Sequence, residues 1–355
     1  MRVFVTGATG FVGSHVVKEL IAGGHRVRGL ARSDAGAKGL AAIGAEVQRG
    51  ALEDIEILRS NAAASDAVIH CGFNHDFSKF MENCQTDKQA IEALGSVLAG
   101  SDRPLIVTSA MAGLARPGQL ATEESALPPD FPMPRVSEPT ALSLVSKGVR
   151  VAVMRLPQVH NTVKQGLVTY AIGVAREKGV SAYVGNGTNR WAAAHVNDVA
   201  RLYRLAVEKP EAGAKWHAVA EEGVRFVEIA ESVGRGLDLE VVSITPEEAP
   251  AHFGWWGMLA GGDLMASSAI TRQKLGWNPT GPGLLADLQQ MDRFVALATV
   301  IGVAGGKLRL DAIALRLTES ERVSSPIRLG WSYKTVRQPR GMKDAPNQGQ
   351  TAHRD

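Results

Sequence analysis

The sequence predicts an α/β fold, in which a doubly wound parallel sheet is joined to a smaller, interwoven C-terminal α/β lobe. Three observations support this prediction. The chain opens with a strand, a glycine-rich turn and a helix within residues 1–32. Strand and helix patterns then alternate over roughly the first 160 residues, as they do where crossover helices join parallel strands. Further strand and helix patterns continue as far as residue 292.

The opening segment is predicted from the spacing of its apolar residues. Residues 3–5 are a short run of β-formers, and apolar residues recur at helical spacing over residues 12–21. Gly23 and Gly24 end that helix, and residues 27–30 predict a second strand. The segment is therefore expected to be a strand–turn–helix–strand unit.

The turn of this unit carries Gly7, Gly10 and Gly13. Gly7 permits a tight bend, Gly10 lets the backbone approach a pyrophosphate, and Gly13 lets the helix pack closely against the sheet. The phosphates would lie at the positive N-terminal end of the helix. Because the triplet follows a predicted strand and opens a predicted helix, it predicts a dinucleotide-binding site.

The remaining elements follow in chain order. Strands are expected at residues 46–48, 66–70, 104–108, 149–154, 181–184, 216–219 and 241–243, and helices at 54–63, 87–100, 137–146, 167–178, 196–207, 226–236 and 284–295. Ligands of parallel sheets bind beyond the carboxyl ends of the strands. The site is therefore expected at residues 71–76, 109–111 and 157–161.

Three parts of the chain are expected. Residues 1–160 would form the nucleotide-binding domain, to which residues 188–210 return, and residues 161–292 would form most of the substrate lobe. Residues 293–355 are expected to be a basic, poorly ordered tail. From Asp292 onward, 11 Lys and Arg stand against 6 Asp and Glu, with little apolar periodicity.

Composition narrows the class of protein. The 355 residues are 45% hydrophobic and 21% charged, as in soluble globular proteins, and the net charge of +3 predicts no nucleic-acid partner. Cys71 and Cys84 form no CxxC pair, which argues against a disulfide framework or a thiolate zinc site. No signal segment is evident, and no apolar run reaches the ~20 residues of a membrane helix. We expect a cytoplasmic protein with a small-molecule substrate and no metal ion, and a homodimer is left open.

The glycine turn, read in TGATGFVG, has the spacing GxxGxxG and resembles that of the extended short-chain dehydrogenase/reductase family. Residues 66–70, 107–109, 155–159 and 195–200 are also similar to segments of this family. The likeness runs from residue 1 to about residue 292, and is greatest to atypical, NAD-dependent epimerase/dehydratase-like members. It implies a Rossmann domain and an oxidoreductase that acts on the carbonyl or hydroxyl of a small metabolite.

The end of the second strand favours NADP(H) over NAD. An acid about twenty residues beyond the glycines would bind the ribose of NAD, but that position falls near Ala31, which Arg32 and Ser33 follow. A guanidinium suits a 2′-phosphate, and Ser33 adds a hydroxyl donor. The residues expected to bind the cofactor are Gly7, Thr9, Gly10, Phe11, Val12, Gly13, Arg32, Ser33, Leu52, Cys71, Gly72, Pro157 and Val159.

One part of the family pattern is missing. The resemblance implies a Tyr-x-x-x-Lys pair, in which the tyrosine carries a proton and the lysine lowers its pKa, with a serine that holds the substrate oxygen. Ser109 matches that serine. When the chain is aligned through Arg155, Pro134 stands at the tyrosine position and Glu138 at the lysine position. Glu138 is instead expected to form an ordinary salt bridge with Arg135.

Two main accounts of function remain open. In the first, hydride transfer persists with another proton donor. His75 and His160 are the candidates, because each follows a strand that ends at the site and histidine titrates near neutrality. In the second, the protein binds NADP without chemistry, as a sensor or partner-binding module. A nucleotide-sugar epimerase- or dehydratase-like activity is a further alternative. The tryptophans of the C-terminal half would either line the substrate pocket or pack in the core: Trp191, Trp255, Trp256 and Trp277.

Overall fold

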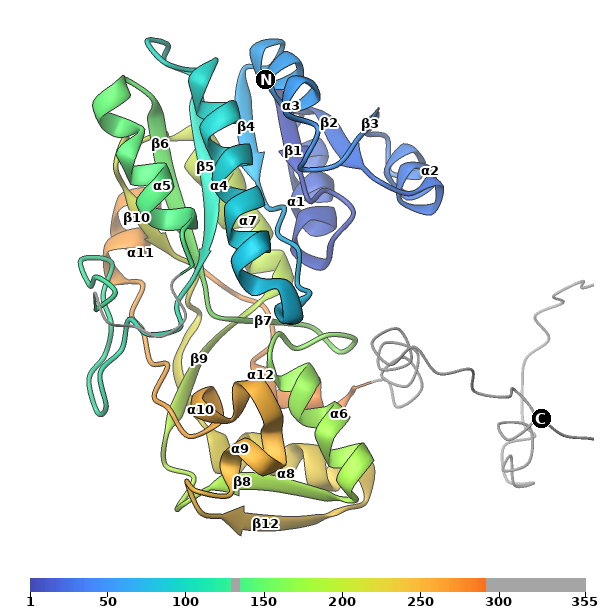
Figure 1. Cartoon of the computed structure of the whole chain (residues 1–355), viewed down its shortest axis with the longest axis vertical. Helices are drawn as coiled ribbons and strands as arrows, with labels where there is room; N and C mark the ends of the chain where they lie inside the picture. The colour runs from blue at the N-terminus through green and yellow to red at the C-terminus, as the bar shows by residue number, and fades with distance from the viewer. Residues whose placement is uncertain (129–134, 292–355) are drawn as a thin grey trace, which may run out of the picture. The chain divides into compact units, whose positions relative to one another are not determined.

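The computed structural model describes residues 1–128 and 135–291, and these belong to one unit of the chain, Met1–Gly305. Its main sheet has seven strands in the order β10-β6-β5-β4-β1-β2-β3 (Figure 1), and every neighbouring pair is parallel. The strands are β1 (Arg2–Thr6), β2 (Arg26–Ala31), β3 (Glu46–Arg49), β4 (Ala67–His70), β5 (Pro104–Ala110), β6 (Arg150–Leu156) and β10 (Lys215–His217). This order confirms the predicted doubly wound sheet. It reverses direction between β1 and β4, which is where such sheets bind ligands.

Helices cover both faces of this sheet (Figure 1). Alternate residues of a strand point to opposite faces, so Val3 and Val5 pack in one core and Phe4 in the other. The first core takes in α1 (Phe11–Ala22), α2 (Asp34–Ala42) and α7 (Val196–Glu208). The second takes in α3 (Ile55–Ala63), α4 (Phe80–Ser96) and α5 (Ser137–Ser143).

A smaller lobe lies beyond the carboxyl ends of the main strands (Figure 1). Its core is formed around two parallel strands, β8 (Val180–Val184) and β12 (Glu240–Ile244). A three-stranded sheet of β11 (Glu221–Arg225), β9 (Arg190–His195) and β7 (Gln158–His160) leads from the main sheet toward it. Its helices and turns are α6 (Val168–Lys178), α8 (Phe226–Leu237), α9 (Ala249–Phe253), η3 (Gly254–Trp256), α10 (Gly257–Ala260) and α12 (Leu284–Gln289).

Some elements differ from the sequence-based expectations. Residues 215–217 were expected in the substrate lobe, but as β10 they extend the main sheet beside β6. Helix α4 begins at Phe80, not at residue 87, because the turn η1 (Phe77–Lys79) leads directly into it. Helix α12 ends at Gln289, and α11 (Ala269–Leu275) was not predicted. The tail expected at 293–355 lies outside the described residues.

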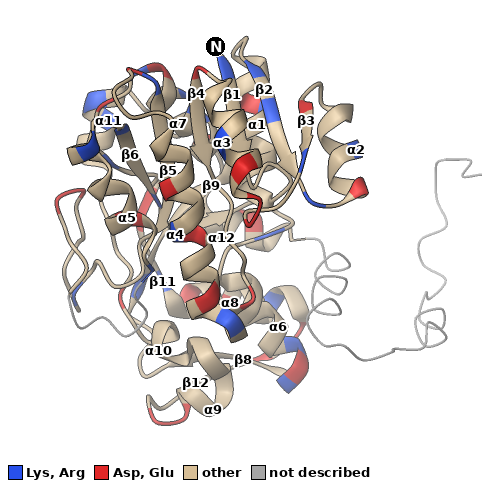
Figure 2. Ribbon diagram, turned by 45° about the horizontal axis from the view of Figure 1, so that its top comes forward, with Lys and Arg blue, Asp and Glu red and all other residues tan. Residues whose placement is uncertain are grey.

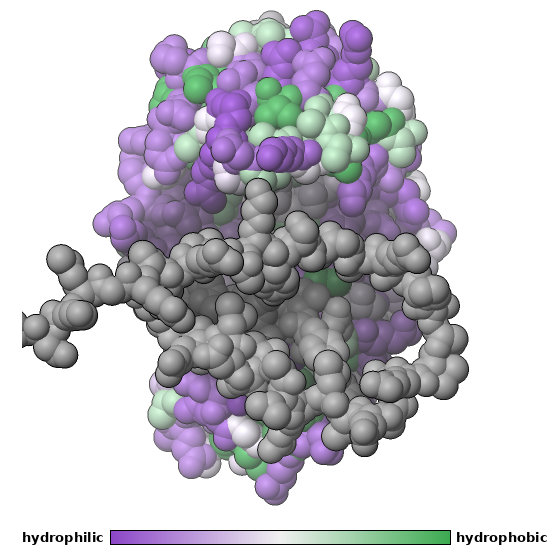
Figure 3. Space-filling view, turned by 90° about the vertical axis from the view of Figure 1, so that its right-hand side faces the viewer, coloured by the Kyte–Doolittle hydropathy of each residue, from purple (hydrophilic) through white to green (hydrophobic). Residues whose placement is uncertain are grey.

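The surface of the described residues is polar and mixed in charge. Lys and Arg are interspersed with Asp and Glu along the ribbon (Figure 2). Hydrophilic residues dominate the upper part of the face in Figure 3, where hydrophobic residues are scattered among them. Among the described residues, no helix combines the length and apolarity that crossing a membrane requires. No group of three or more His, Cys, Asp or Glu side chains in the described ranges is arranged to hold a metal ion.

Candidate cofactor and substrate site

A cavity of about 510 Å³ lies beyond the carboxyl ends of the main strands. One part of it is formed by the glycine turn after β1, where Gly7, Thr9, Gly10, Phe11, Val12 and Gly13 line it. The other part is formed by the ends of β4, β5 and β6 and by side chains of the smaller lobe. The cavity therefore joins the predicted nucleotide site and the predicted substrate region in one space.

The glycine turn has no room for a side chain at Gly7 or at Gly13. Gly7 has a φ of +63°, and a Cβ on it would lie 2.6 Å from the backbone of Cys71. A Cβ on Gly13 would lie 2.1 Å from the carbonyl oxygen of Gly7. Gly10 caps α1 without a side-chain hydrogen bond, so the N-terminal N–H groups of this 12-residue helix face the turn. These features suit a phosphate-binding turn.

Arg32 and Ser33, at the end of β2, have different roles in the structure. Arg32 lines the cavity and is exposed. Ser33 does not line it, because its hydroxyl accepts a hydrogen bond from the Gly36 N–H at 3.1 Å and caps α2. The helix cap therefore replaces the cofactor contact expected of Ser33. Leu52 lines the cavity as expected, together with Glu53, an acid that the sequence analysis did not single out.

The centre of the cavity is lined by Cys71, Gly72, Ser109, Pro157 and Val159. Ser109 is buried at the end of β5. Burial raises the pKa of the Cys71 thiol to about 11, so this thiol stays protonated near neutral pH. Ser109 is therefore the better placed of the two to bind a substrate oxygen.

His75 lines the cavity, but its environment keeps it neutral. Desolvation, and then the positive charges of Arg135 and Lys164, lower the pKa of His75 to about 4, although the residue as a whole is exposed. A neutral imidazole donates a hydrogen bond but does not supply a proton as an imidazolium would. The structure therefore weakens the case for His75 as general acid at neutral pH.

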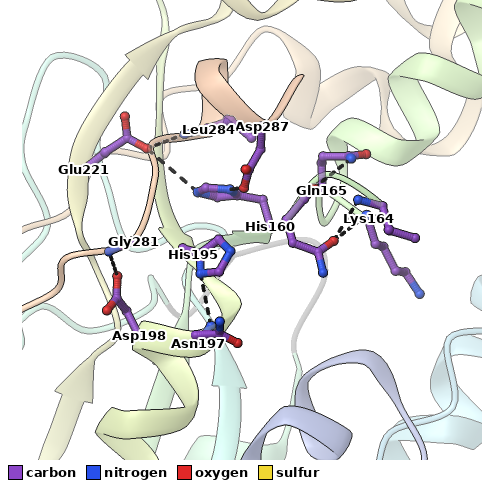
Figure 4. A network of polar contacts seen from close by, with 12 residues as sticks. His160, Lys164, Gln165, His195, Asn197, Asp198, Glu221, Gly281, Leu284 and Asp287 are labelled. Carbon is purple, nitrogen blue, oxygen red and sulfur yellow. Dashed lines mark hydrogen bonds and ion pairs between the residues drawn. The ribbon is translucent and has the colours of Figure 1, made fainter. Parts of the chain in front are cut away.

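His160 does not line the cavity, although it was expected to. It is fully buried, its Nδ1 lies 2.6 Å from Asp287 Oδ2, and its Nε2 lies 3.9 Å from Glu221 Oε2 (Figure 4). Glu221 also accepts a hydrogen bond from the Leu284 N–H at 2.7 Å. These contacts tie β7, β11 and α12 together, so His160 has a structural position and is not placed to give a proton to a substrate.

The position aligned with the lysine of the missing Tyr/Lys pair, Glu138, serves the fold. Arg155 is fully buried and donates two hydrogen bonds to Glu138, from Nε at 2.8 Å and from Nη2 at 2.5 Å. The expected salt bridge between Glu138 and Arg135 is therefore not formed, and Glu138 of α5 pairs instead with Arg155 of β6. Pro134 lies outside the described residues.

Several cavity residues were missed by the sequence analysis. Tyr170 on α6 lines the cavity, and burial raises the pKa of its phenol. Its ring packs edge-on against Trp255, with centroids 5.6 Å apart. Trp255 stacks on Phe77 at 4.1 Å, which brings the smaller lobe and the main domain into contact. No spacing in the sequence links these positions, because the three rings come from η1, α6 and η3.

Trp255 differs from the other tryptophans considered. It lines the cavity and is 42% exposed, whereas three others are buried. Trp191 and Trp256 pack in the core of the smaller lobe and Trp277 in a core of the main domain. Of the two expected alternatives, pocket lining therefore holds for Trp255, and core packing holds for the other three tryptophans.

Comparison with known proteins agrees with this architecture. The model of the NAD dependent epimerase/dehydratase family matches residues 3–220. An uncharacterized protein of Schizosaccharomyces pombe is 48% identical over 290 residues, which cover 81% of this chain and 98% of that protein. The sterol-4-alpha-carboxylate 3-dehydrogenase (decarboxylating) of Dictyostelium discoideum is 26% identical over 63% of this chain and 73% of its own length. The structure of DesIV, a dTDP-glucose 4,6-dehydratase of Streptomyces venezuelae with NAD bound, superposes with a TM-score of 0.66 at 20% identity and covers 86% of this chain and 99% of its own.

Proposed function

This chain belongs to the NAD-dependent epimerase/dehydratase family of extended short-chain dehydrogenases/reductases, and from that premise we propose that it is an NADP-dependent oxidoreductase. Its substrate would be a small metabolite with a carbonyl or hydroxyl group. The observation that carries this proposal is the single cavity that runs from the glycine turn to Ser109 and the aromatic side chains beyond it. A cytoplasmic location remains a prediction from composition.

The residues at the nucleotide end of the cavity fit NADP. The helix N-terminus and the glycines of the turn suit a pyrophosphate. Arg32 lines the cavity next to this turn, and its guanidinium suits a 2′-phosphate. Glu53 lines the cavity after β3, where it would meet the adenosine half. At the end of β2, where an NAD enzyme has an acid, this chain has the positive charge of Arg32, which favours NADP.

The substrate end supplies a hydroxyl and a phenol. When bound, NADPH supplies the hydride for reduction of a carbonyl. The Ser109 hydroxyl would donate a hydrogen bond to the substrate oxygen, and the neutral phenol of Tyr170 would supply the proton. Tyr170 thus takes the role that the missing tyrosine would have, from a helix of the smaller lobe.

Steady-state oxidation of NADPH with a panel of aldehydes and ketones tests this proposal. On a substrate that the panel identifies, Tyr170→Phe should lower kcat about tenfold to a hundredfold with little change in KM, because it removes the proton and leaves the ring. Ser109→Ala should lower kcat/KM as well. Tyr183→Phe is the matched control, because Tyr183 lies on β8 and is not among the residues that line the cavity.

Two results would contradict the proposal. If no carbonyl compound is reduced although both NADP forms bind, the sensor account is preferred. If Tyr170→Phe keeps full turnover, the phenol is not the proton donor. A nucleotide-sugar epimerase or dehydratase is the second candidate, favoured by the family match itself, and the conversion of sugar nucleotides without net oxidation of cofactor would identify it.

A further inference from the structure

One positive charge in the cavity lies among its aromatic side chains. Three cationic side chains line it, Arg32, Lys164 and Arg135, whereas Glu53 is the one acid among the described lining residues. Arg32 lies beside the glycine turn, and Lys164 Nζ is 5.9 Å from the ring centroid of Phe11, the first residue of α1. Both cations are therefore near the elements that would hold phosphates.

Arg135 lies beside the aromatic side chains of the cavity. Its Cζ lies 4.1 Å from the ring centroid of Phe73, which follows β4 and also lines the cavity. Phe73 packs against Phe80, which packs against Phe77, and Phe77 stacks on Trp255. The positive charge of Arg135 therefore faces the space that the substrate would occupy.

The guanidinium of Arg135 is fixed by a chain of hydrogen bonds to buried side chains. Its Nε donates a hydrogen bond to Ser137 Oγ at 2.9 Å, and that hydroxyl donates to Asp87 Oδ2 at 2.5 Å. The other oxygen of Asp87 lies 2.9 Å from His70 Nε2, with Asp87, His70 and Ser137 all buried. A side chain fixed through Nε presents its two Nη groups outward, as a fork that matches an oxyanion.

The charge of Arg135 is not neutralised by a direct ion pair among the described residues. Glu138, the acid nearest in sequence, is engaged by Arg155, and Asp87 is reached only through the Ser137 hydroxyl. Desolvation lowers the pKa of Arg135, and the charge of Asp87 offsets part of this shift. Such a group is stabilised when an anion binds to it.

We propose that Arg135 anchors an oxyanion of the substrate, and that the substrate is an apolar acid, with a carboxylate joined to a hydrophobic body. This inference rests on the proposed function. The rest of the substrate half supports the apolar body, because the cavity is lined there by Phe73, Phe77, Met111, Leu127, Trp255, Leu259 and Leu264. A sugar nucleotide, with two phosphates and several hydroxyls, matches this lining less well.

A pair of fluorescent probes tests the anchor directly. 1-Anilinonaphthalene-8-sulfonate (ANS) is an apolar anion, and N-phenyl-1-naphthylamine is the same body without the charge. Each is titrated into the full-length protein with and without saturating NADP⁺. In wild type the anion should bind at least about tenfold more tightly than the neutral probe, as expected for a charge-assisted contact. Decanoate should displace the anion more effectively than 1-decanol does.

Variants at position 135 distinguish a specific contact with Arg135 from non-specific binding of the probes. Arg135→Gln should remove the preference for the anion and leave the neutral probe within about twofold, and Arg135→Lys should restore part of it. Arg59→Gln, on the exposed face of α3, is the matched control and should change neither.

The results that would overturn the role of Arg135 differ from those that would overturn the proposed function. A wild-type protein that binds both probes equally, or an Arg135→Gln variant that keeps the preference, would overturn the anchor. Equal displacement by decanoate and 1-decanol would also overturn it. A failure to bind NADP⁺ would instead overturn the proposed function, and the probe comparison without nucleotide would still decide the role of Arg135.

Discussion

His217 illustrates how one buried side chain links folding to pH. Its Nδ1 lies 2.7 Å from the Ser267 carbonyl oxygen and its Nε2 lies 3.0 Å from Arg155 Nη1. The ring therefore donates to the carbonyl and accepts from the guanidinium, which is the neutral tautomer. Burial, together with the charge of Arg155, lowers the pKa of His217 from 6.5 to about 4. A second proton would have to displace the hydrogen bond from Arg155.

This lowered pKa predicts a loss of stability in mild acid. Between pH 6.5 and about 4 the unfolded chain binds a proton at this position and the folded chain does not. The contribution of His217 is therefore complete above pH 6.5 and falls as the pH drops, by about 2 kcal/mol between pH 7 and pH 5. Urea unfolding at both pH values measures the change.

The His217→Gln variant isolates this contribution from those of other buried groups. It should be less stable than wild type at pH 7, because two buried hydrogen bonds are weakened. Its loss of stability between pH 7 and pH 5 should be smaller than that of wild type. Equal losses in the two proteins would show that His217 is not a source of the acid sensitivity.

At the scale of elements, the ion pair between Glu138 of α5 and Arg155 of β6 joins a helix to the main sheet. Arg155 is fully buried, and its bonds to Glu138 fix the helix that follows the residues at 129–134. Arg155 also donates to the carbonyl oxygens of Glu123 and Ser125. Removing the carboxylate would leave a buried guanidinium without its counter-charge.

Glu138→Gln should therefore lower the free energy of unfolding by about 3 kcal/mol. Glu46→Gln provides the comparison, since Glu46 pairs with Arg28 at 2.7 Å but is half exposed, and its loss should be below about 1 kcal/mol. Thermal and urea unfolding of the two variants give the measurement. Similar small effects in both would mean that the buried pair contributes little to stability.

The helices and strands whose apolar residues form a clear pattern were predicted from the sequence. Most strands of the main sheet are short apolar runs, and helices α1, α3, α7 and α8 follow an apolar spacing near 3.6 residues. The strands β7, β9 and β11 were not predicted. Their pairing depends on partners far along the chain, such as Gln158 with Ala193.

The candidate site was predicted in part for the same reason. The glycine turn and Arg32 belong to one local unit, so spacing alone predicted them, whereas the surroundings of His160 depend on Asp287, 127 residues away. Tyr170 and Trp255 are brought to the cavity by the smaller lobe, and Arg135 is oriented by Asp87 through Ser137. Contacts of this range have no signature in a single sequence.

At the scale of the whole molecule, the main domain and the smaller lobe each contribute residues to the site. The main sheet supplies a nucleotide turn and the buried Ser109, and the smaller lobe supplies the phenol and the aromatic side chains. The contact between Phe77 and Trp255 joins the two. The proposed reaction requires both a bound nicotinamide nucleotide and an apolar substrate in one cavity.

Titration of the protein with NADP⁺, NADPH, NAD⁺ and NADH, in wild type and Arg32→Glu, tests this account most directly. Both NADP forms should bind wild type at least about tenfold more tightly than the NAD forms, and Arg32→Glu should abolish that preference. Arg59→Glu should leave it unchanged. Binding of no nucleotide, or a preference that Arg32→Glu leaves intact, would contradict the account, and binding of the oxidised forms alone would favour a sensor over an oxidoreductase.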